Sequence, residues 1–318
     1  MPADTPSENL KISVADFIKN APAELKFEIL AGAGGLHNKE ITSSLVHKLG
    51  LALAGLPLRE HAGGVQIIGR DEIAYLLQLD RKRKVEVLKT LDCENISCIL
   101  IAENLDAPPE FLQMADAKNL PVIHTLQTAS NIINLASNYL HEILAPQMNV
   151  HGVLLGMYGV GVLIRGESGV GKSECALDLI VRGHRLVSDD RIILKRIGGR
   201  LEGSSPELTY GHLEIRGLGI VNVRDLFGVS TIRRLKQIDL VIELKRWANA
   251  AEVERLGLER REDEIFDVKI PKFILPVSAG RNLSTLIETA VRIHLSRESG
   301  FDAARDLIEK HSAMLDQE

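Results

Sequence analysis

The sequence GESGVGKS at Gly166–Ser173 is the feature that most constrains what this chain can fold into. It fits the pattern GxxxxGK[ST], whose glycines permit positive φ angles and so turn successive backbone N–H groups toward one anion. Such a loop needs a strand before it and a helix after it, because the helix adds its positive N-terminal end. GVLIR at Gly161–Arg165 reads as the strand, and ECALDLIVRG is a helical pattern closed by Gly183. We therefore expect nucleotide phosphates to bind here, on an α/β fold.

The side chains of this loop have separate tasks. Lys172 supplies a mobile positive charge to the β- and γ-phosphates, and the hydroxyl group of Ser173 is a ligand for Mg²⁺. The remaining positions contribute mainly their backbone N–H groups. The predicted phosphate-binding residues are Gly166, Glu167, Ser168, Gly169, Val170, Gly171, Lys172 and Ser173.

The overall composition excludes several classes of protein. A length of 318 residues is more than one core usually fills, so two domains are expected. The net charge of -5 argues against binding to nucleic acid or to a membrane surface. The first residues, MPADTPSENL, lack the features of a signal peptide, and the longest uncharged apolar run is too short to span a bilayer. Three cysteines without metal-binding spacing fit a reducing compartment, so a cytoplasmic protein is expected.

The first half of the chain alternates strand-like and helical patterns. The helical patterns are DEIAYLLQLD and PPEFLQMADAKN, whose apolar residues recur at three and four positions. This alternation predicts an α/β layer with a mostly parallel sheet. The glycine-rich stretch GAGGLHN is expected to be a turn and not a phosphate-binding loop. The predicted strands lie at Val65–Gly69, Cys98–Ala102 and Leu120–Thr125.

Two helical patterns bear on the domain organisation. ASNIINLASNYLHEILAP is predicted to be a helix that ends at Pro146 and bridges the domains. We expect an N-terminal α/β domain over residues 1–140 and a C-terminal phosphate-loop domain over residues 141–318. The tail FDAARDLIEKHSAML is predicted to be a helix for packing or for contact with a partner. Its apolar stripe comprises Phe301, Ala304, Leu307, Ile308, His311 and Leu315.

Two adjacent aspartates follow the loop. HRLVSDD reads as a short strand that ends in Asp189 and Asp190, whose side chains point in opposite directions, so one carboxylate is expected to enter the site. Kinases of hydroxyl acceptors use such an aspartate to orient and deprotonate the hydroxyl, whereas hydrolases need only position water. The alternative is a solvated turn, or a helix cap formed with Ser188. Closeness to the loop favours the functional interpretation.

Three other features carry little chemistry by themselves. His151 lies one strand upstream of the loop, and a lone histidine is usually a satisfied or solvated one. EIRGLGIVNV at Glu214–Val223 combines a candidate buried carboxylate with an arginine and two spaced glycines, and alone it predicts a strand with a bend. Arg255, within ERLGLERRED, has the surroundings of a solvated helix surface.

Taken together, these segments resemble the bifunctional HPr kinase/phosphorylase family. The similarity includes HGVLLGMYGVGVLIRGESGVGKSECALDLIVRGHRLVSDD, EIRGLGIVNV and FILPVSAGRN at Phe273–Asn282. The first half is similar to the family's N-terminal domain through HKLGLALAGL, VQIIGRDEIAYL and LPVIHT, so the resemblance covers nearly the whole chain. EIRGLGIVNV close behind the loop is much more specific than the loop itself.

The resemblance implies a homohexameric, Mg²⁺-dependent enzyme that regulates carbon metabolism through two activities. One activity phosphorylates a regulatory serine on the phosphocarrier protein HPr with ATP, or with pyrophosphate in some members. The other removes that phosphate by phosphorolysis, in which inorganic phosphate attacks and pyrophosphate forms. The resemblance also implies a catalytic domain akin to phosphoenolpyruvate carboxykinase and a first domain similar to a Mur ligase domain.

The resemblance assigns roles by position. Asp190 matches the catalytic base for the acceptor serine, which in reverse is protonated and donates to the leaving oxygen. Lys172 matches the lysine that stabilises charge on the transferring phosphoryl group. His151 and Arg255 fall on active-site positions, where a histidine can tune the aspartate or hold phosphate and an arginine can pair with phosphate oxygens.

Two further matches concern the metal and the reverse reaction. Ser173 and Glu214 match the Mg²⁺ ligands. PVSAGR at Pro276–Arg281 matches a stretch linked to the phosphorylase direction, but Ser278 and Ala279 stand where many members have Arg-Pro or Ala-Pro. This departure removes a possible phosphate contact and a rigid turn residue.

Two other functions stay open at this point. A phosphate-loop kinase of another acceptor, or a simple NTPase, would share the loop, although the chain lacks the LSGGQ segment of transporters and the NKxD segment of GTPases. A non-catalytic module that senses ATP or phosphate would share the loop without transferring anything.

Overall fold

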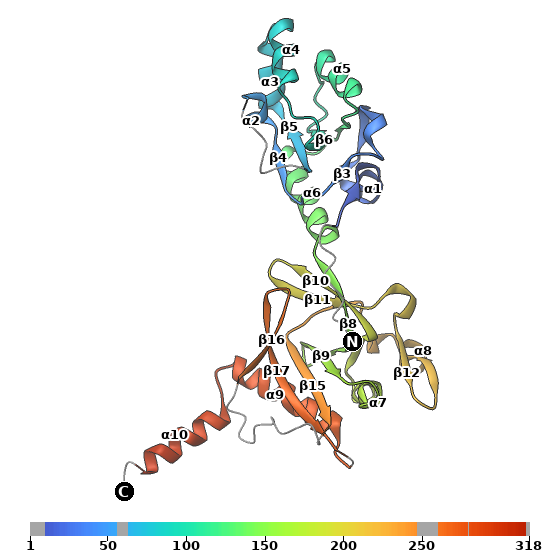
Figure 1. Ribbon diagram of the computed structural model, residues 1–318, viewed down its shortest axis with the longest axis vertical. Coiled ribbons are helices and arrows are strands. Elements are labelled where there is room, and N and C mark those ends of the chain that lie inside the picture. The colour runs from blue at the N-terminus through green and yellow to red at the C-terminus, as the bar shows by residue number, and fades with distance from the viewer. Residues whose placement is uncertain (1–9, 56–62, 247–259, 279, 316–318) are drawn as a thin grey trace. The chain divides into compact units, whose positions relative to one another are not determined.

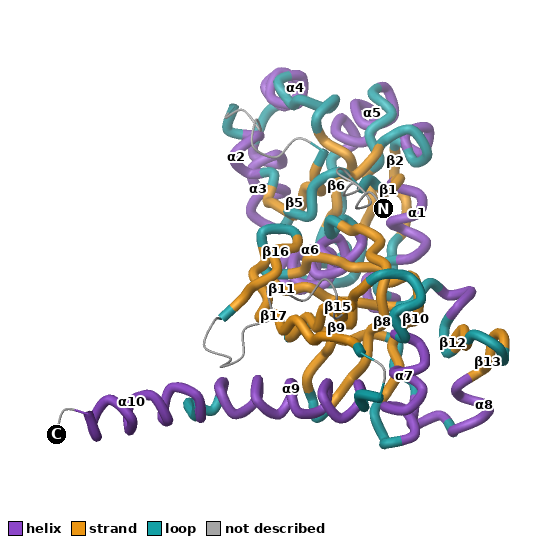
Figure 2. Tube along the Cα trace, turned by 60° about the horizontal axis from the view of Figure 1, so that its bottom comes forward, coloured by secondary structure: helices purple, strands orange, loops and turns teal. Residues whose placement is uncertain are grey.

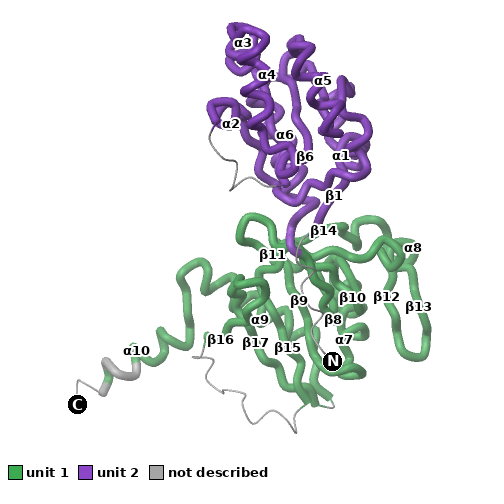
Figure 3. The backbone as a smooth tube through the Cα atoms, turned by 45° about the horizontal axis from the view of Figure 1, so that its top comes forward, with its two compact units in different colours: residues 1–6, 147–318 green, residues 7–146 purple. Residues whose placement is uncertain are grey.

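The chain folds into two compact units, residues 7–146 and the chain from Gln147 onward (Figures 1 and 3). The computed structural model describes residues 10–55, 63–246, 260–278 and 280–315. The protein is a mixed α/β structure, as predicted, with parallel strands in the main sheet of each unit. Among the described residues, no helix combines the length and apolarity needed to cross a membrane.

The unit 7–146 is built on a five-stranded sheet. The three predicted strands are its central strands, and they pair in parallel with one another. Strands β5 and β6 are buried along their whole length, as expected for a parallel sheet covered on both faces. The strands lie in the order β2 (Glu28–Ala31), β7 (Val122–His124), β6 (Ile96–Ile101), β5 (Gly64–Ile68) and β4 (Val46–Lys48), with a separate pair β1 (Ile12–Ser13) and β3 (Glu40–Ile41).

Helices cover both faces of this sheet, because two separate apolar clusters flank it. The helix predicted to end at Pro146 is α6, which ends slightly earlier, at Ile143. The glycine-rich stretch predicted as a turn contains a single 3₁₀ turn at Ala33–Gly35. The helices are α1 (Val14–Asn20), α2 (Gly50–Leu53), α3 (Arg70–Gln78), α4 (Arg81–Lys89), α5 (Pro109–Ala117) and α6 (Ala129–Ile143).

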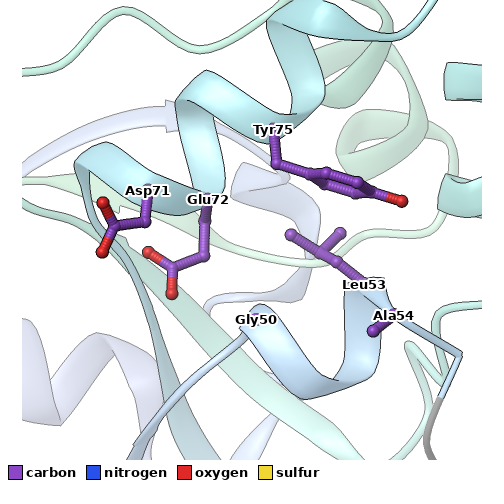
Figure 4. A pocket seen from close by; sticks show the side chains of 6 residues that line it. All are labelled: Gly50, Leu53, Ala54, Asp71, Glu72 and Tyr75. Atoms are coloured by element: carbon purple, nitrogen blue, oxygen red, sulfur yellow. The ribbon is translucent and has the colours of Figure 1, made fainter.

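A small cavity of about 190 Å³ lies between α2 and α3 (Figure 4). Asp71, Glu72 and Tyr75 line it from α3, and Leu53 lines it from α2. The carboxylate of Glu72 accepts a hydrogen bond from the backbone N–H of Gly69 at 2.9 Å, so this side chain caps the first turn of α3. Glu72 therefore has a structural role in this cavity.

The second unit is built on an eight-stranded sheet. The segment HGVLLGMYGVGVLIRG contributes to the antiparallel hairpin β8–β9, and β15 pairs in parallel with both β9 and β17. This places the carboxyl end of β9, where the phosphate loop begins, at the same edge as the ends of β15 and β17. The order is β14 (Leu235–Gln237), β11 (Arg200–Ser204), β10 (Arg185–Ile197), β8 (Gln147–Met157), β9 (Val160–Gly166), β15 (Leu240–Arg246), β17 (Val268–Val277) and β16 (Arg261–Ile265).

The helices α7 (Lys172–Val181) and α9 (Leu283–Glu298) pack on one face of this sheet, where they share an apolar cluster with the strands. The opposite face carries a second cluster, made by strands and their connections. The last helix, α10 (Ala303–Leu315), extends away from the sheet (Figure 2). On its predicted apolar stripe Phe301 and Leu307 are 69% and 67% exposed.

Two local expectations are corrected. The segment EIRGLGIVNV is not one bent strand but an antiparallel ribbon of β12 (His212–Ile215) and β13 (Gly219–Asn222), followed by α8 (Val223–Phe227). Gly217 and Gly219, at the turn between the two strands, have φ angles of 90° and 85°. These positive values, which glycine adopts readily, allow the chain to reverse direction within a few residues. The strand of HRLVSDD does not end at the aspartates, because β10 continues to Ile197 and pairs with β8 on both sides of them.

Candidate active site

The phosphate loop has the conformation that its sequence predicts. Gly169 and Gly171 have φ angles of 74° and 99°, values that residues with a Cβ atom rarely adopt. Helix α7 begins directly at Lys172, and no side chain caps its N-terminus. The first N–H groups of the helix are therefore available to an anion, and the helix dipole favours negative charge at this point.

Lys172 is held inside its own loop. Its ammonium group donates hydrogen bonds to the carbonyl oxygens of Gly166 and Glu167 at 2.9 and 3.0 Å. Burial lowers the pKa of Lys172, and the carboxylates of Asp189 and Asp190 act in the opposite direction. The ammonium group is thus partly removed from water and feels the negative charge of two carboxylates. A bound phosphate group would give it the charged hydrogen-bond acceptors that it lacks among the described residues.

Asp189 connects the loop to the ribbon β12–β13. Its buried carboxylate accepts a hydrogen bond from the Ser173 hydroxyl at 3.1 Å and another from the backbone N–H of Glu214 at 3.1 Å. Burial raises the pKa of Asp189, and these two hydrogen bonds oppose the rise. Asp189 was not among the predicted site residues, because the sequence pattern did not separate it from its neighbour.

Asp190 contacts the other predicted catalytic side chain. One of its carboxylate oxygens lies 2.9 Å from Nδ1 of His151 on β8, and both side chains are at least half exposed. The register explains the contact, since Arg191 pairs with His151 and Asp190 with Gly152. Asp190 has a left-handed φ of 64°, so the alternation of an extended strand does not hold here. Both carboxylates act to raise the pKa of Lys172, so the expectation that only one of them enters the site stays a prediction.

The ribbon brings Glu214 and Arg216 toward the loop. The side chain of Glu214 is exposed, not buried as its sequence pattern suggested, while its backbone is fixed by Asp189. A Cβ atom at Gly169 would lie 3.6 Å from Nη2 of Arg216, so this guanidinium group is beside the phosphate loop. Arg216 was not singled out in the sequence, although it stands within the specific segment EIRGLGIVNV.

The oxygen donors at this point fit a hard divalent cation. The Ser173 hydroxyl and the Asp189 carboxylate are in contact, and Glu214 of β12, whose backbone N–H donates to Asp189, carries a second carboxylate. In the described ranges, no group of three or more acidic, histidine or cysteine side chains could hold a metal ion by itself. A magnesium ion here would take its remaining ligands from nucleotide phosphates and water, which is its usual behaviour in proteins.

Two predicted features fall outside the described residues. Arg255 lies in 247–259, and Ala279 of the PVSAGR stretch is also not described. Ser278 is half-buried, and its carbonyl oxygen accepts a hydrogen bond from the backbone N–H of Arg281 at 3.3 Å.

Both units match known protein families. The model of the HPr Serine kinase C-terminal domain matches residues 142–311, and the model of the HPr Serine kinase N terminus matches residues 12–140. The chain belongs to the HPr kinase/phosphorylase family. The resemblance inferred from the sequence is therefore confirmed, and so is the enzyme class, a bifunctional kinase/phosphorylase.

Relatives in this family match over nearly the full length. The chain is 41% identical over 310 residues to the HPr kinase/phosphorylase of Geobacter sulfurreducens, with 97% of each chain covered. It is 40% identical over 301 residues to the HPr kinase/phosphorylase of Bacillus cereus strain G9842, covering 94% of this chain and 96% of the relative. A solved structure of the Hpr(Ser) kinase/phosphatase from Coxiella burnetii is 37% identical, covers 50% of this chain and 98% of that one, and has a TM-score of 0.47.

Proposed function

We propose that this protein phosphorylates a regulatory serine of HPr with ATP or pyrophosphate. We further propose that it removes the phosphate by phosphorolysis, in which inorganic phosphate attacks phosphoserine and pyrophosphate forms. The observation that carries the proposal is the pair of Asp190 and His151, 2.9 Å apart, next to the phosphate loop and Lys172. A hydrolase would need only a residue that positions water, whereas a kinase of a hydroxyl acceptor needs a carboxylate that accepts the hydroxyl proton, and we assign that role to Asp190.

In the forward direction Asp190 takes the proton of the serine hydroxyl as the oxygen attacks the terminal phosphorus, and the bond from that phosphorus to the donor breaks, releasing ADP from ATP or inorganic phosphate from pyrophosphate. His151 orients the carboxylate through its Nδ1 contact. In the reverse direction the protonated Asp190 donates to the leaving serine oxygen, as microscopic reversibility requires. One carboxylate thus serves both directions, because phosphoryl transfer depends on in-line positioning and charge neutralisation rather than on the direction of transfer.

The phosphate loop holds the β-phosphate of ATP in one direction and inorganic phosphate in the other. Lys172 leaves its two carbonyl partners for phosphate oxygens and stabilises charge on the transferring group. Ser173 and Glu214 would hold a bound Mg²⁺, which would supply further charge neutralisation, and Asp189 would orient the Ser173 hydroxyl. Arg216, beside the loop, and Arg255 are the proposed additional cations for phosphoryl oxygens.

The wider assignments are part of the same proposal. They comprise a cytoplasmic homohexamer that regulates carbon metabolism, a catalytic domain akin to phosphoenolpyruvate carboxykinase and a Mur-ligase-like first domain. The family membership supports them. Residues 1–140 and 141–318 are the proposed domains.

The deciding experiment incubates the protein with HPr, ATP and Mg²⁺, and separately incubates phosphoseryl-HPr with inorganic phosphate. We expect phosphoserine in the first mixture and free HPr with pyrophosphate in the second. The proposal fails if HPr stays unmodified over a range of Mg²⁺, ATP and pyrophosphate concentrations. ATP turnover with a small metabolite but none with HPr would identify a kinase of another acceptor, and nucleotide binding without any transfer would identify a sensing module.

A further inference from the structure

A second cavity lies at the opposite end of the central strands from the phosphate loop. It has a volume of about 570 Å³, within the range of about 300–1,000 Å³ typical of metabolite sites. Its wall includes Val160 at the start of β9 and Val268 at the start of β17. The phosphate loop follows Gly166 at the other end of β9, about 20 Å away for a strand of this length. The cavity therefore belongs to no part of the proposed active site.

A buried histidine faces this cavity without a partner. His294 of α9 lines the cavity and is 8% exposed. Its ring makes no hydrogen bond or ion pair with any described residue. Its ring nitrogens are not sealed from solvent, so they can form hydrogen bonds to a molecule in the cavity. A ligand in the cavity would supply the missing partner.

The cavity also offers cationic donors. Arg200, the first residue of β11, lines it and forms no hydrogen bond or ion pair with the described residues. Lys236 reaches Asp239 at 3.4 Å, but that carboxylate already accepts from the backbone N–H of Gly161 at 2.7 Å and from the side chain of Gln237 at 2.8 Å. Both carboxylate oxygens of Asp239 thus have hydrogen-bond partners within the protein.

The remaining charges define the ligand. Lys269 adds a third cation, whose ammonium group lies 3.8 Å from Glu262, and the exposed Glu298 adds a second carboxylate to the lining. Among the described charged and histidine side chains of the lining, Arg200 and His294 are hydrogen-bond donors without a protein partner, and Glu298 is the acceptor without one. An acid group of the ligand suits Arg200 and Lys269, and hydroxyl groups of the ligand suit Glu298 and His294.

We propose that this cavity binds a small hydroxylated organic anion, a carboxylate or a phosphate ester, through Arg200 and His294. This inference does not depend on the acceptor of the phosphoryl transfer, because none of its residues touches the phosphate loop. The walls come from the β8–β9 turn, the β10–β11 turn, β14, β17 and α9, so a bound anion would join segments that are distant in sequence.

The test uses the full chain carrying Lys172→Ala, so that anion binding at the phosphate loop is removed. Citrate, glycerol 3-phosphate and the neutral polyol sorbitol are titrated by calorimetry. We expect one of the two anions, and not sorbitol, to bind saturably at one site per chain. The relative affinities of citrate and glycerol 3-phosphate show whether the acid group is a carboxylate or a phosphate ester.

Variants made in the same background locate the binding. Arg200 is exposed at the start of β11, so Arg200→Gln is not expected to affect folding, and we expect it to weaken binding about ten- to hundredfold. His294→Gln should weaken it as well. Lys195→Gln, on the same β10–β11 hairpin but outside the cavity, should leave the affinity unchanged.

Two results would overturn the proposal. One is that neither anion binds at concentrations up to about 10 mM, tenfold above the upper end of usual metabolite affinities. The other is that Lys195→Gln weakens binding as much as Arg200→Gln, which would show diffuse attraction to a basic surface.

Discussion

The two ends of helix α7 are built in opposite ways. At the N-terminal end, within the described part of the chain, no side chain caps the helix and the ammonium group of Lys172 has only carbonyl oxygens as direct partners. Two glycines there have positive φ angles. At the C-terminal end the polar groups are paired with one another. Glu288 of α9 accepts from His184 at 2.9 Å, from Tyr158 at 3.0 Å and from Arg182 at 3.1 Å.

The C-terminal end is a closed network. His184 is 6% exposed and makes an edge contact with the ring of Tyr158, whose hydroxyl group in turn accepts a hydrogen bond from Arg292 at 2.7 Å. Burial acts to raise the pKa of Glu288, but the hydrogen bonds from His184, Tyr158 and Arg182 outweigh it and lower the pKa. Glu288 is thus matched by three donors inside the protein.

The comparison shows how one helix can serve two purposes. Groups left without partners are costly in the free protein, and they are the groups that bind a ligand or transition state. Groups matched within the protein stabilise the fold and have nothing left to offer a ligand. Substitutions at the N-terminal end should therefore change activity more than stability, and substitutions at the C-terminal end should do the reverse.

The largest effect is expected from Lys172→Ala. Loss of the ammonium group should lower the rate of phosphoryl transfer by about 10³-fold or more. This is the range expected when a protein group that stabilises the negative charge of the transferring phosphoryl group is removed. The melting temperature should stay the same or rise, because burial already disfavours this charge. Transfer assays and thermal denaturation check both parts, with Lys195→Gln as the control, and a clear loss of stability would contradict the contrast between the two ends.

Asp190→Asn is expected to have the next largest effect. Removal of the base should slow both directions by about 10²–10⁴-fold, while nucleotide binding persists. Asparagine tolerates the left-handed φ of 64°, so folding should be preserved. Forward and reverse assays are compared with a nucleotide titration, and Asp267→Asn, on an exposed turn, is the matched control. Near-normal transfer by Asp190→Asn would show that the base is a different residue.

The sequence predicted the N-terminal end of α7 far better than the C-terminal end. The loop, its strand and its helix are local, so a pattern of eight residues specifies them. The pairing of Glu288 with His184 joins residues 104 positions apart, and no local pattern indicates it. The spacing of apolar residues predicts individual helices and strands, but it does not predict contacts between elements that are distant in sequence.

Within the candidate site, the sequence identified residue types but not their geometry. The roles of Asp189 and Asp190 could not be separated, because the distinction rests on the positive φ of Asp190 and on the bulge in β10. The position of Arg216 beside Gly169 depends on the β12–β13 ribbon, which the pattern predicted as a single strand. The family resemblance supplied roles for Asp190 and Glu214 that composition alone could not.

Glu288→Gln should reveal the opposite behaviour at the C-terminal end. A neutral amide would weaken charge-assisted hydrogen bonds to three side chains, so stability at pH 7 should fall by about 1.5–3 kcal/mol. The transfer rate per folded molecule should be unchanged. Urea denaturation measures the first and transfer assays the second, with the exposed Glu298→Gln on the same helix as the control. A slower transfer rate with unchanged stability would reverse the assignment of the two ends.

The same variant predicts a pH dependence. Because the native pKa of Glu288 lies below that of the unfolded chain, its contribution to stability is fully present above the unfolded value of about 4.3. It is lost as the pH falls through the lower native pKa. The difference in unfolding free energy between wild type and Glu288→Gln should therefore be largest near pH 7 and shrink below about pH 4. Urea denaturation across this range measures it, and a difference that widened on acidification would show that the network does not stabilise the ionised carboxylate.

The smallest effect is expected from Arg246→Gln. This variant tests whether a positive charge near the phosphate loop changes the transfer rate when its side chain does not contact the phosphoryl group. Arg246, at the end of β15, lies 3.7 Å from the carboxylate of Glu167 in the loop, but both side chains are more than half exposed. Exposed pairs of this kind contribute about 0–1 kcal/mol, since water and salt screen them. Transfer rate should change by less than about threefold, and the change should vanish at high salt. A loss comparable to that of Lys172→Ala, measured in the same assay, would mean that Arg246 contacts the phosphoryl group and that the cationic part of the site extends beyond the N-terminal end of α7.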